Sequence, residues 1–287
     1  MKSMIYERGL LWISLLIAII VICRGGIDRI SAASPSTNTN DSSHSVRIYS
    51  TLAEIKQAKD GEIIFRPCSG NEPVVTFIRI EKNLKTKASW FSIEARDASA
   101  GLWVETNHGM FLPDPLAEGD KIVYMKGRLE SVWYAGRVFR LAAVPKYSPG
   151  NPQDIPEAIS VSVRECGGAK DGNTPGTVNA VGRNTDSMLI KVKGISSGYG
   201  KNGESEWFFL DDGSGVPNDN GYKGVRIMRG TDVFDPSVHF PTRDGTRVEV
   251  EGLSTSKDIQ GVGRIRGLRI RYDGKGIVSD RVRMIGR

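Results

Sequence analysis

Two stretches of similar pattern decide the fold: ASWFSIEARDASAGLWVET at residues 88–106 and SEWFFLDDGSGVPNDNGYKGVRIM at residues 205–228. Each starts with aromatic and aliphatic residues, passes through a segment of small and acidic residues, and ends in a second apolar run. Apolar residues at every second position are typical of a β-strand with one buried face. Each stretch therefore predicts a strand, a turn and a second strand.

The two stretches belong to a unit that occurs twice along the chain. Trp90-Phe91 in the first copy aligns with Trp207-Phe208 in the second, and further along VYMKG aligns with VEVEG. The copies extend over about residues 57–147 and 175–273. Such a repeat indicates one supersecondary structure used twice.

Each unit contains five strand patterns, with a less regular segment between the third and the fourth. This arrangement predicts a small Greek-key barrel of the oligonucleotide/oligosaccharide-binding (OB) type. The expected fold class is all-β, with two five-stranded OB-like barrels in tandem and one short helix at Thr51–Ala58. The predicted strands lie near Val74–Ile80, Trp90–Arg96, Gly101–Glu105, Lys121–Arg128 and Arg137–Val144 in the first unit, and near Met188–Gly194, Glu206–Asp211, Gly224–Met228, Arg247–Gly252 and Arg264–Tyr272 in the second.

The residues of the second unit resemble a known family. The series FFLDDGSG, GYKGVRI, DGTRVEVEG and GRIRGLRI resembles the OB-fold-like domains that occur in tandem in large exported bacterial proteins. TLAEIKQAKDGEIIF is similar to the lead-in of such domains. The resemblance covers most of residues 50–272, although EARDASAG replaces DDGSG in the first unit. It implies a binding module and brings no set of catalytic residues.

The chain divides into five parts. Residues 1–33 are typical of a signal peptide or an N-terminal anchor, because Lys2 and Arg8 precede the uncharged apolar run Gly9–Cys23. This predicts a secreted, periplasmic or cell-surface protein that contacts a membrane only through this segment, if it is retained. The other parts are a flexible spacer at 34–49, the first barrel at 50–147, a linker and lead-in segment at 148–174, and the second barrel with a basic C-terminal end at 175–287.

Export would place the remaining cysteines in an oxidising compartment. Cys68 and Cys166 then either form one disulfide between the two halves or stay as unpaired thiols, and the sequence leaves both alternatives open. The three histidines stand far apart and no Cys-x-x-Cys pair is present. We therefore expect no metal site and no cofactor.

No pattern of a catalytic site is complete. Asp211 and Asp212 do not fit a calcium-binding loop, and we interpret them as turn-forming residues, with a cation site or a glycosidase acid pair as alternatives. Residues 194–198 match Gly-x-Ser-x-Gly, but the hydrolase elbow requires a helix after it, and a loop and a strand follow here. The sequence therefore predicts no catalytic residues and a protein that is not an enzyme.

Strand alternation places aromatic side chains on the outer face of each predicted barrel. Trp90 and Trp103 share this face in the first unit, and Trp207, Phe209 and Arg226 share it in the second. The second and third strands carry the usual ligand face of this barrel type. These residues are candidates for binding a polymer by stacking, and the alternative is that they cover apolar surface between the barrels.

The last predicted strand, GRIRGLRIRY at 263–272, contains four arginines. We expect a bulge at Gly267-Leu268, because it would turn Ile265, Leu268 and Ile270 to the core, and burial of three apolar side chains is favourable. All four arginines would then face outward as a ladder suited to phosphate, sulfate or carboxylate groups. The alternative is a solvated edge strand. The members of the ladder are Arg264, Arg266, Arg269 and Arg271.

The net charge is +6, and the segment 261–287 alone carries eight basic and two acidic residues, 8 − 2 = +6. Any surface for a polyanion would therefore lie toward the C-terminal end. The sequence predicts a non-enzymatic exported binding protein that engages an extended polymer, either single-stranded nucleic acid or an anionic polysaccharide. The alternative is a cell-envelope scaffold or adhesion module that contacts other proteins.

Overall fold

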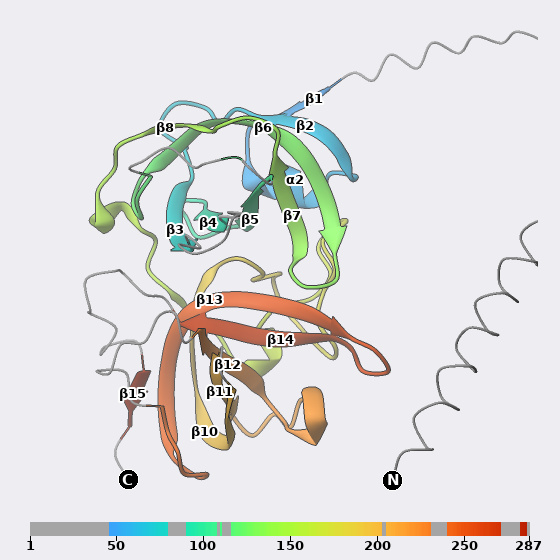
Figure 1. Ribbon diagram of the computed structural model, residues 1–287, viewed down its shortest axis with the longest axis vertical. Helices are drawn as coiled ribbons and strands as arrows, with labels where there is room; N and C mark the ends of the chain where they lie inside the picture. The colour runs from blue at the N-terminus through green and yellow to red at the C-terminus, as the bar shows by residue number, and fades with distance from the viewer. Residues whose placement is uncertain are drawn as a thin grey trace, which may run out of the picture. The chain divides into compact units, whose positions relative to one another are not determined.

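The computed structural model describes residues 46–79, 90–107, 110, 116–202, 205–230, 240–270 and 282–285. The predicted signal or anchor segment at 1–33 lies outside the described residues. Residues 45–287 form one compact unit, in which two strongly curved sheets follow each other along the chain (Figure 1). In the described part of the chain, no helix is both long and apolar enough to cross a lipid bilayer.

The first sheet closes into a five-stranded ring. Its strands pair in the order β3–β4–β5–β7–β6–β3, and the β5–β7 pair is parallel while the others are antiparallel. A ring in which the third strand pairs with the fifth is a Greek-key barrel of the OB type. The strands are β3 (Val74–Arg79), β4 (Trp90–Glu94), β5 (Gly101–Thr106), β6 (Lys121–Val132) and β7 (Gly136–Leu141).

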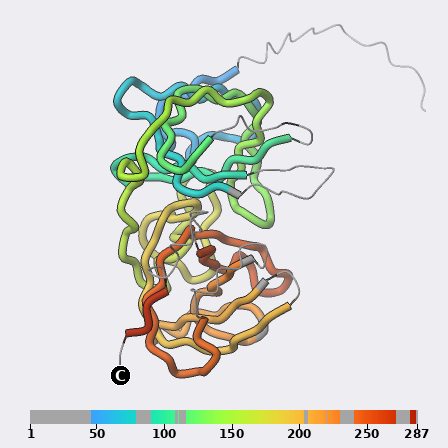
Figure 2. Tube along the Cα trace, turned by 60° about the vertical axis from the view of Figure 1, so that its left-hand side comes forward, coloured from blue at the N-terminus to red at the C-terminus, as the bar shows by residue number. Residues whose placement is uncertain are grey.

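The second sheet repeats this topology. Its ring runs β10–β11–β12–β14–β13–β10, again with one parallel pair, between β12 and β14. The chain coloured yellow to red in Figure 2 follows this ring. The strands are β10 (Leu189–Asn202), β11 (Ser205–Asp211), β12 (Val225–Gly230), β13 (Arg247–Ile259) and β14 (Gly263–Ile270), and β15 (Val282–Met284) pairs with β13. The predicted fold class, two OB-like barrels in tandem, is confirmed.

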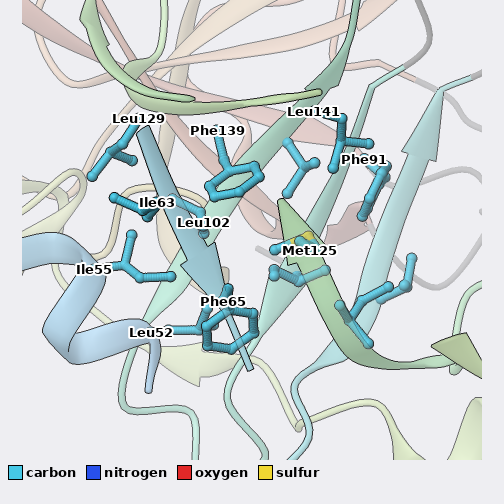
Figure 3. Close-up of a cluster of buried hydrophobic side chains, with 14 of the residues drawn as sticks. Leu52, Ile55, Ile63, Phe65, Phe91, Leu102, Met125, Leu129, Phe139 and Leu141 are labelled. Atoms are coloured by element: carbon cyan, nitrogen blue, oxygen red, sulfur yellow. The ribbon is translucent and has the colours of Figure 1, made fainter. Parts of the chain in front are cut away.

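A lead-in segment fills one end of the first barrel. Helix α2 (Leu52–Gln57) starts with a capping box, in which Thr51 and Glu54 each accept a backbone N–H from the other. Leu52 and Ile55 point from α2 into the core of the barrel (Figure 3). The predicted short helix is thus confirmed. Next to it, β1 (Arg47–Tyr49) pairs with β2 (Gly61–Phe65), which pairs with β6.

A similar lead-in serves the second barrel. After β8 (Lys146–Ser148), the chain forms the 3₁₀ turn η1 (Pro152–Asp154), the short strand β9 (Ile159–Ser160) and the 3₁₀ turn η2 (Val163–Glu165). β9 pairs with β10, and Val163 and Cys166 enter the second core, where they meet residues of the ring such as Phe208. The segment predicted as linker and lead-in therefore contributes to the packing of a barrel.

The two cysteines of this part of the chain do not pair. Cys68 is exposed after β2, whereas Cys166 is buried in the second core, and both are free thiols. Of the two alternatives left open by the sequence, the disulfide is wrong. Burial also raises the pKa of the Cys166 thiol to about 12, so its reactive thiolate form is scarce at neutral pH.

Buried polar groups join the first barrel to the residues that enter β10. Lys56 of α2 donates to both oxygens of Asn184, at 3.0 and 3.2 Å, and to the carbonyl oxygen of Asp186 at 3.5 Å. The Asp186 carboxylate accepts a 2.7 Å hydrogen bond from Ser256, whose hydroxyl accepts one from Arg264 at 3.0 Å. Burial lowers the pKa of Lys56 to about 8 and raises that of Asp186 to about 6.

Strand β4 contributes two further bonds to the same segment. The Ser92 hydroxyl donates to the carbonyl oxygen of Ser187 at 2.8 Å, and the Glu94 carboxylate accepts the N–H of Leu189 at 2.9 Å. The first barrel and the segment that enters β10 approach each other closely here, since a Cβ on Gly101 of β5 would lie 2.1 Å from the carbonyl oxygen of Ser187. Burial raises the pKa of Glu94 to about 8, so this carboxyl group is largely protonated at neutral pH.

The raised pKa of Glu94 predicts that the protein loses stability as the pH increases from 6 to 8. Because the folded pKa of about 8 lies above the ordinary value of 4.5, the folded chain binds more protons between these values. The contribution is complete below about pH 4.5 and is lost as pH rises toward 8. Glu94→Gln should remove a decline of about 2 kcal/mol in the free energy of unfolding between pH 6 and 8, measured by urea denaturation.

The matched control for this prediction is Glu62→Gln, an exposed carboxylate on β2. Asp186 is half ionised at about pH 6, so only the last part of its destabilising change falls between pH 6 and 8. Lys56 acts in the opposite sense as pH rises toward its pKa of about 8, and these two small contributions offset each other. The window from 6 to 8 therefore reports Glu94. An equal decline in both variants would contradict the prediction.

Candidate functional site

The two outer tryptophans of the first barrel are covered. Trp90 and Trp103 are only 9% and 5% exposed, and their rings stack with centroids 3.8 Å apart. Phe77 of β3 extends the stack on the far side of Trp90, at 5.0 Å. Leu253 of β13 packs in the same cluster. These tryptophans thus lie between the barrels, which was the alternative to ligand binding.

Arg269 of β14 completes this contact. Its guanidinium lies 5.6 Å from the ring centroid of Trp90 and 5.8 Å from that of Trp103. A guanidinium over an aromatic face is attracted by the negative face of the ring, and more strongly where water is excluded. The face of the first barrel that OB proteins offer to ligands is therefore occupied by the second barrel.

The predicted ladder of four exposed arginines is wrong. The β13–β14 pairing runs without a register shift from Gly252–Ile270 to Ile259–Gly263, so the expected bulge at Gly267-Leu268 is absent. Strict alternation places Arg264 and Arg266 on the same face as Leu268, and Ile265 with Arg269 on the other. Arg271 lies outside the described residues.

The two arginines beside Leu268 are buried because oxygens surround them. Arg266 is 1% exposed and donates to the carbonyl oxygens of Cys166 and Val178 and to the Thr177 hydroxyl. Arg264 donates to Ser256, to the Asp258 carboxylate and to the carbonyl oxygen of Val132 in the first barrel. Hydrogen bonds to these oxygens reduce the cost of burying a guanidinium, so the strand needs no bulge to turn it outward.

The corresponding face of the second barrel is different, because the loop between β11 and β12 contributes side chains to it. Arg226 of β12 lies 4.6 Å from the ring centroid of Trp207, and donates to the Asp219 carboxylate at 2.8 Å. Asp219 belongs to the 3₁₀ turn η3 (Asp219–Gly221), which Asn218 anchors by donating to the carbonyl oxygens of Gly224 and Arg266. The turn thus fixes the guanidinium over the indole.

The same loop supplies a second aromatic pair. Tyr222, which is 40% exposed, stacks on the fully buried Phe209 with ring centroids 4.4 Å apart. Two glycines of β10 make room, since a Cβ on Gly198 would lie 2.2 Å from the Tyr222 ring and one on Gly200 would lie 2.4 Å from Trp207. We call the residues Trp207, Phe209, Asp219, Tyr222 and Arg226 the open face.

The two acids that follow Trp207 and Phe209 in β11 and the next loop shape a turn, as predicted. Asp211 accepts the N–H groups of Gly213 and Gly215, and Asp212 accepts those of Ser214 and Val163. Asp212 thereby ties the turn to η2. Within the described residues, no group of three or more His, Cys, Asp or Glu side chains is placed to hold a metal ion.

A cluster of charges lies at the end of β11. The Glu206 carboxylate pairs with Lys201 at 2.7 Å and with Arg229, whose guanidinium also lies 4.7 Å from the Phe240 ring. Burial alone would raise the pKa of Glu206, but the hydrogen bonds from Lys201 and Arg229 hold it below its ordinary range. The carboxylate thus stays charged and balances these cations.

The sequence reasoning identified Trp207, Phe209 and Arg226 but missed Tyr222 and Asp219. Both lie in the loop between the second and third strands of the ring, where no alternation indicates which way a side chain points. The sequence signal for these two residues was the group of turn-forming residues NDNGYKG. A tyrosine is unusual in such an otherwise polar segment. It also missed Trp133, an exposed tryptophan at the end of β6.

Fold and open face together define the chain as a tandem OB-like barrel protein. No protein-family model matches it, and no curated protein does. Among solved structures it is similar to the crystal structure of fission yeast Pot1 with ssDNA, at 10% identity and a TM-score of 0.30, over 80% of this chain and 85% of that chain. At this level the match carries no argument about a ligand, and the fold assignment rests on the strand pairings.

The Asp219–Arg226 pair should matter more to stability than an ordinary surface ion pair. Asp219→Ala leaves a part-buried guanidinium without its carboxylate, so we expect the free energy of unfolding to fall by about 1–3 kcal/mol. Glu249→Ala removes a pair whose cation, Lys193, is largely exposed and can be solvated without its partner, so it should cost less than about 1 kcal/mol. Urea denaturation followed by tryptophan fluorescence measures both. Equal losses would show that Asp219 does not hold Arg226 in solution.

Proposed function

We propose that this protein is an exported, non-enzymatic binding protein whose second barrel engages single-stranded nucleic acid through the open face. The observation that carries the proposal is the Arg226–Trp207 pair beside the Tyr222–Phe209 stack, on the strands where OB barrels bind ligands. A single-strand binding platform combines aromatic rings that bases can stack on with basic side chains along the backbone path, and here Arg226 is the basic side chain next to the rings.

The asymmetry between the barrels supports this assignment. In the first barrel the equivalent aromatics lie under Leu253 and Arg269, whereas in the second Tyr222 is 40% exposed and Trp207 is part-buried. An exposed aromatic on a rigid strand-and-turn support is ready to bind without prior rearrangement. The second barrel is therefore the binding module and the first is its structural support.

Two further parts of the proposal rest on other observations. The absence of catalysis is supported by Ser196, the serine of the Gly-x-Ser-x-Gly match, which is 1% exposed and donates its hydroxyl proton to the carbonyl oxygen of Arg243. A nucleophile needs that proton to be taken by a base. Export is supported by the charged and apolar pattern of residues 1–33.

A second candidate function is a cell-envelope scaffold that binds other proteins. It is favoured by the burial of Trp90 and Trp103, because this molecule already uses an OB ligand face to pack against protein. In that function the open face would contact a partner protein and would not bind an oligonucleotide.

The test is binding of a fluorescent single-stranded oligonucleotide of about 16 nucleotides, the upper end of what one OB barrel covers. Tyr222→Ala and Arg226→Ala should each weaken binding by about 5- to 150-fold, since stacking contributes roughly 1–3 kcal/mol per base, and Arg226→Ala should also reduce the salt dependence. The matched controls are Tyr124→Ala and Lys146→Ala, which disrupt a cation–aromatic pair of the first barrel.

The outcomes separate the candidates. Loss of binding in the open-face variants but not in the controls supports the proposal. A sulfated glycan that binds more tightly than the oligonucleotide, with the same dependence on Tyr222, replaces nucleic acid by an anionic polysaccharide. No binding of either polyanion at low salt contradicts polymer binding and leaves the scaffold.

A further inference from the structure

A second site lies where hairpins of the two barrels meet, away from the open face. It is a groove of about 730 Å³, lined by Ser131–Trp133 at the end of β6, by residues of the segment 169–180, and by Asp258 and Arg264 of the β13–β14 hairpin. This volume is typical of small-molecule sites. None of the candidate residues of the open face borders it.

The hairpin contact that forms the groove uses main-chain atoms. The Trp133 carbonyl oxygen accepts the N–H of Asp258 at 2.6 Å, and the Val132 carbonyl oxygen accepts from Arg264 at 3.0 Å. Any residue at position 133 would provide that carbonyl, so the contact does not explain a tryptophan there.

The Trp133 side chain is instead left open. It is 59% exposed, in contrast to 9% for Trp90 and 5% for Trp103, and its ring meets Tyr134 edge-on at 5.4 Å. A large exposed aromatic at the rim of a groove is a favourable surface for a flat ligand, since stacking on it removes apolar area from water.

The charges around this indole are predominantly positive. The Lys257 ammonium lies 5.4 Å from the Trp133 ring centroid, and the exposed Lys170 lines the groove. Neither lysine forms an ion pair with any residue that the structure describes. Arg264 is already balanced by Asp258 at 2.7 Å. Among the charged residues that line the groove or contact the indole, the sum is three cations against one carboxylate, 3 − 1 = +2.

We propose that this groove binds a nucleotide unit, with the base stacked on Trp133 and the phosphate held by Lys170 and Lys257. Stacking on an aromatic ring tolerates any base because every base has a flat face, and two lysines that pair with no acid among the described residues can attract phosphate. The unit is either a free nucleotide or one residue of a strand. The proposal does not require that the open face binds a polymer.

The test uses the whole protein and four probes: adenosine monophosphate, adenosine, inorganic phosphate and a short oligodeoxyadenylate, with affinities measured by calorimetry. The monophosphate should bind more tightly than adenosine or phosphate alone. Trp133→Ala should weaken its binding by about 5- to 150-fold, and Trp133→Phe should restore part of the loss. Lys170→Ala with Lys257→Ala should reduce affinity for the monophosphate but not for adenosine.

Matched controls exclude indirect effects. Lys126→Ala removes an exposed lysine of β6 outside the groove, and Tyr124→Ala removes a tyrosine of β6 that pairs with Lys146 and does not line the groove, so neither should change binding of the monophosphate. Since Trp133 packs little, its variants should unfold at the wild-type temperature. A monophosphate that binds better than the oligonucleotide identifies the free nucleotide as the source, and the reverse identifies a strand.

Three results would overturn the proposal. They are no binding of the monophosphate at millimolar concentration, binding that Trp133→Ala leaves unchanged, or an equal affinity for a sulfated disaccharide with the same dependence on Trp133. Each is separate from the test of the open face, because the groove is judged by binding of adenosine monophosphate and its dependence on Trp133, whereas the open face is judged by binding of the longer oligonucleotide and its dependence on Tyr222.

Discussion

The contact on which the rest of the structure depends is between buried polar groups of the first barrel and the chain that enters β10. Lys56, Ser92 and Glu94 are all buried, and each bonds to an atom of residues 184–189. Unpaired, such groups would each cost more than an ordinary hydrogen bond contributes. These groups of the first barrel therefore find their hydrogen-bond partners only beside the second, and the two barrels act as one structural unit.

This constraint divides the roles of two similar halves. To bring Glu94 onto Leu189, the outer face of β4 and β5 must approach the second barrel, which covers Trp90 and Trp103 with Leu253 and Arg269. A duplicated barrel starts with two ligand faces, and here one is used for packing. The loop that carries Asp219 and Tyr222 then equips the remaining face, whereas EARDASAG in the first unit is too short for an equivalent turn.

Alternation and repetition predict the fold because the core of a small barrel needs apolar residues at every second position of each strand. Phe91 and Ile93, like Phe208 and Leu210, are in the cores as expected. The same reasoning failed at β14, where burial of Ile265 seemed to require a bulge. The strand keeps its register because carbonyl oxygens about 90 to 130 residues earlier in sequence receive the two guanidinium groups. No local pattern contains such distant acceptors.

The candidate sites also depend on contacts that no local sequence pattern contains. Four tryptophans of the described chain look alike in sequence, yet Trp90 and Trp103 are buried by a neighbouring barrel, Trp207 lies under a guanidinium, and Trp133 is open. These tryptophans differ in whether the packing around them uses the indole ring or only main-chain atoms. At Val132 and Trp133 the hydrogen bonds between the two hairpins use carbonyl oxygens and do not depend on the Trp133 side chain, which leaves this exposed indole available for the nucleotide that we propose.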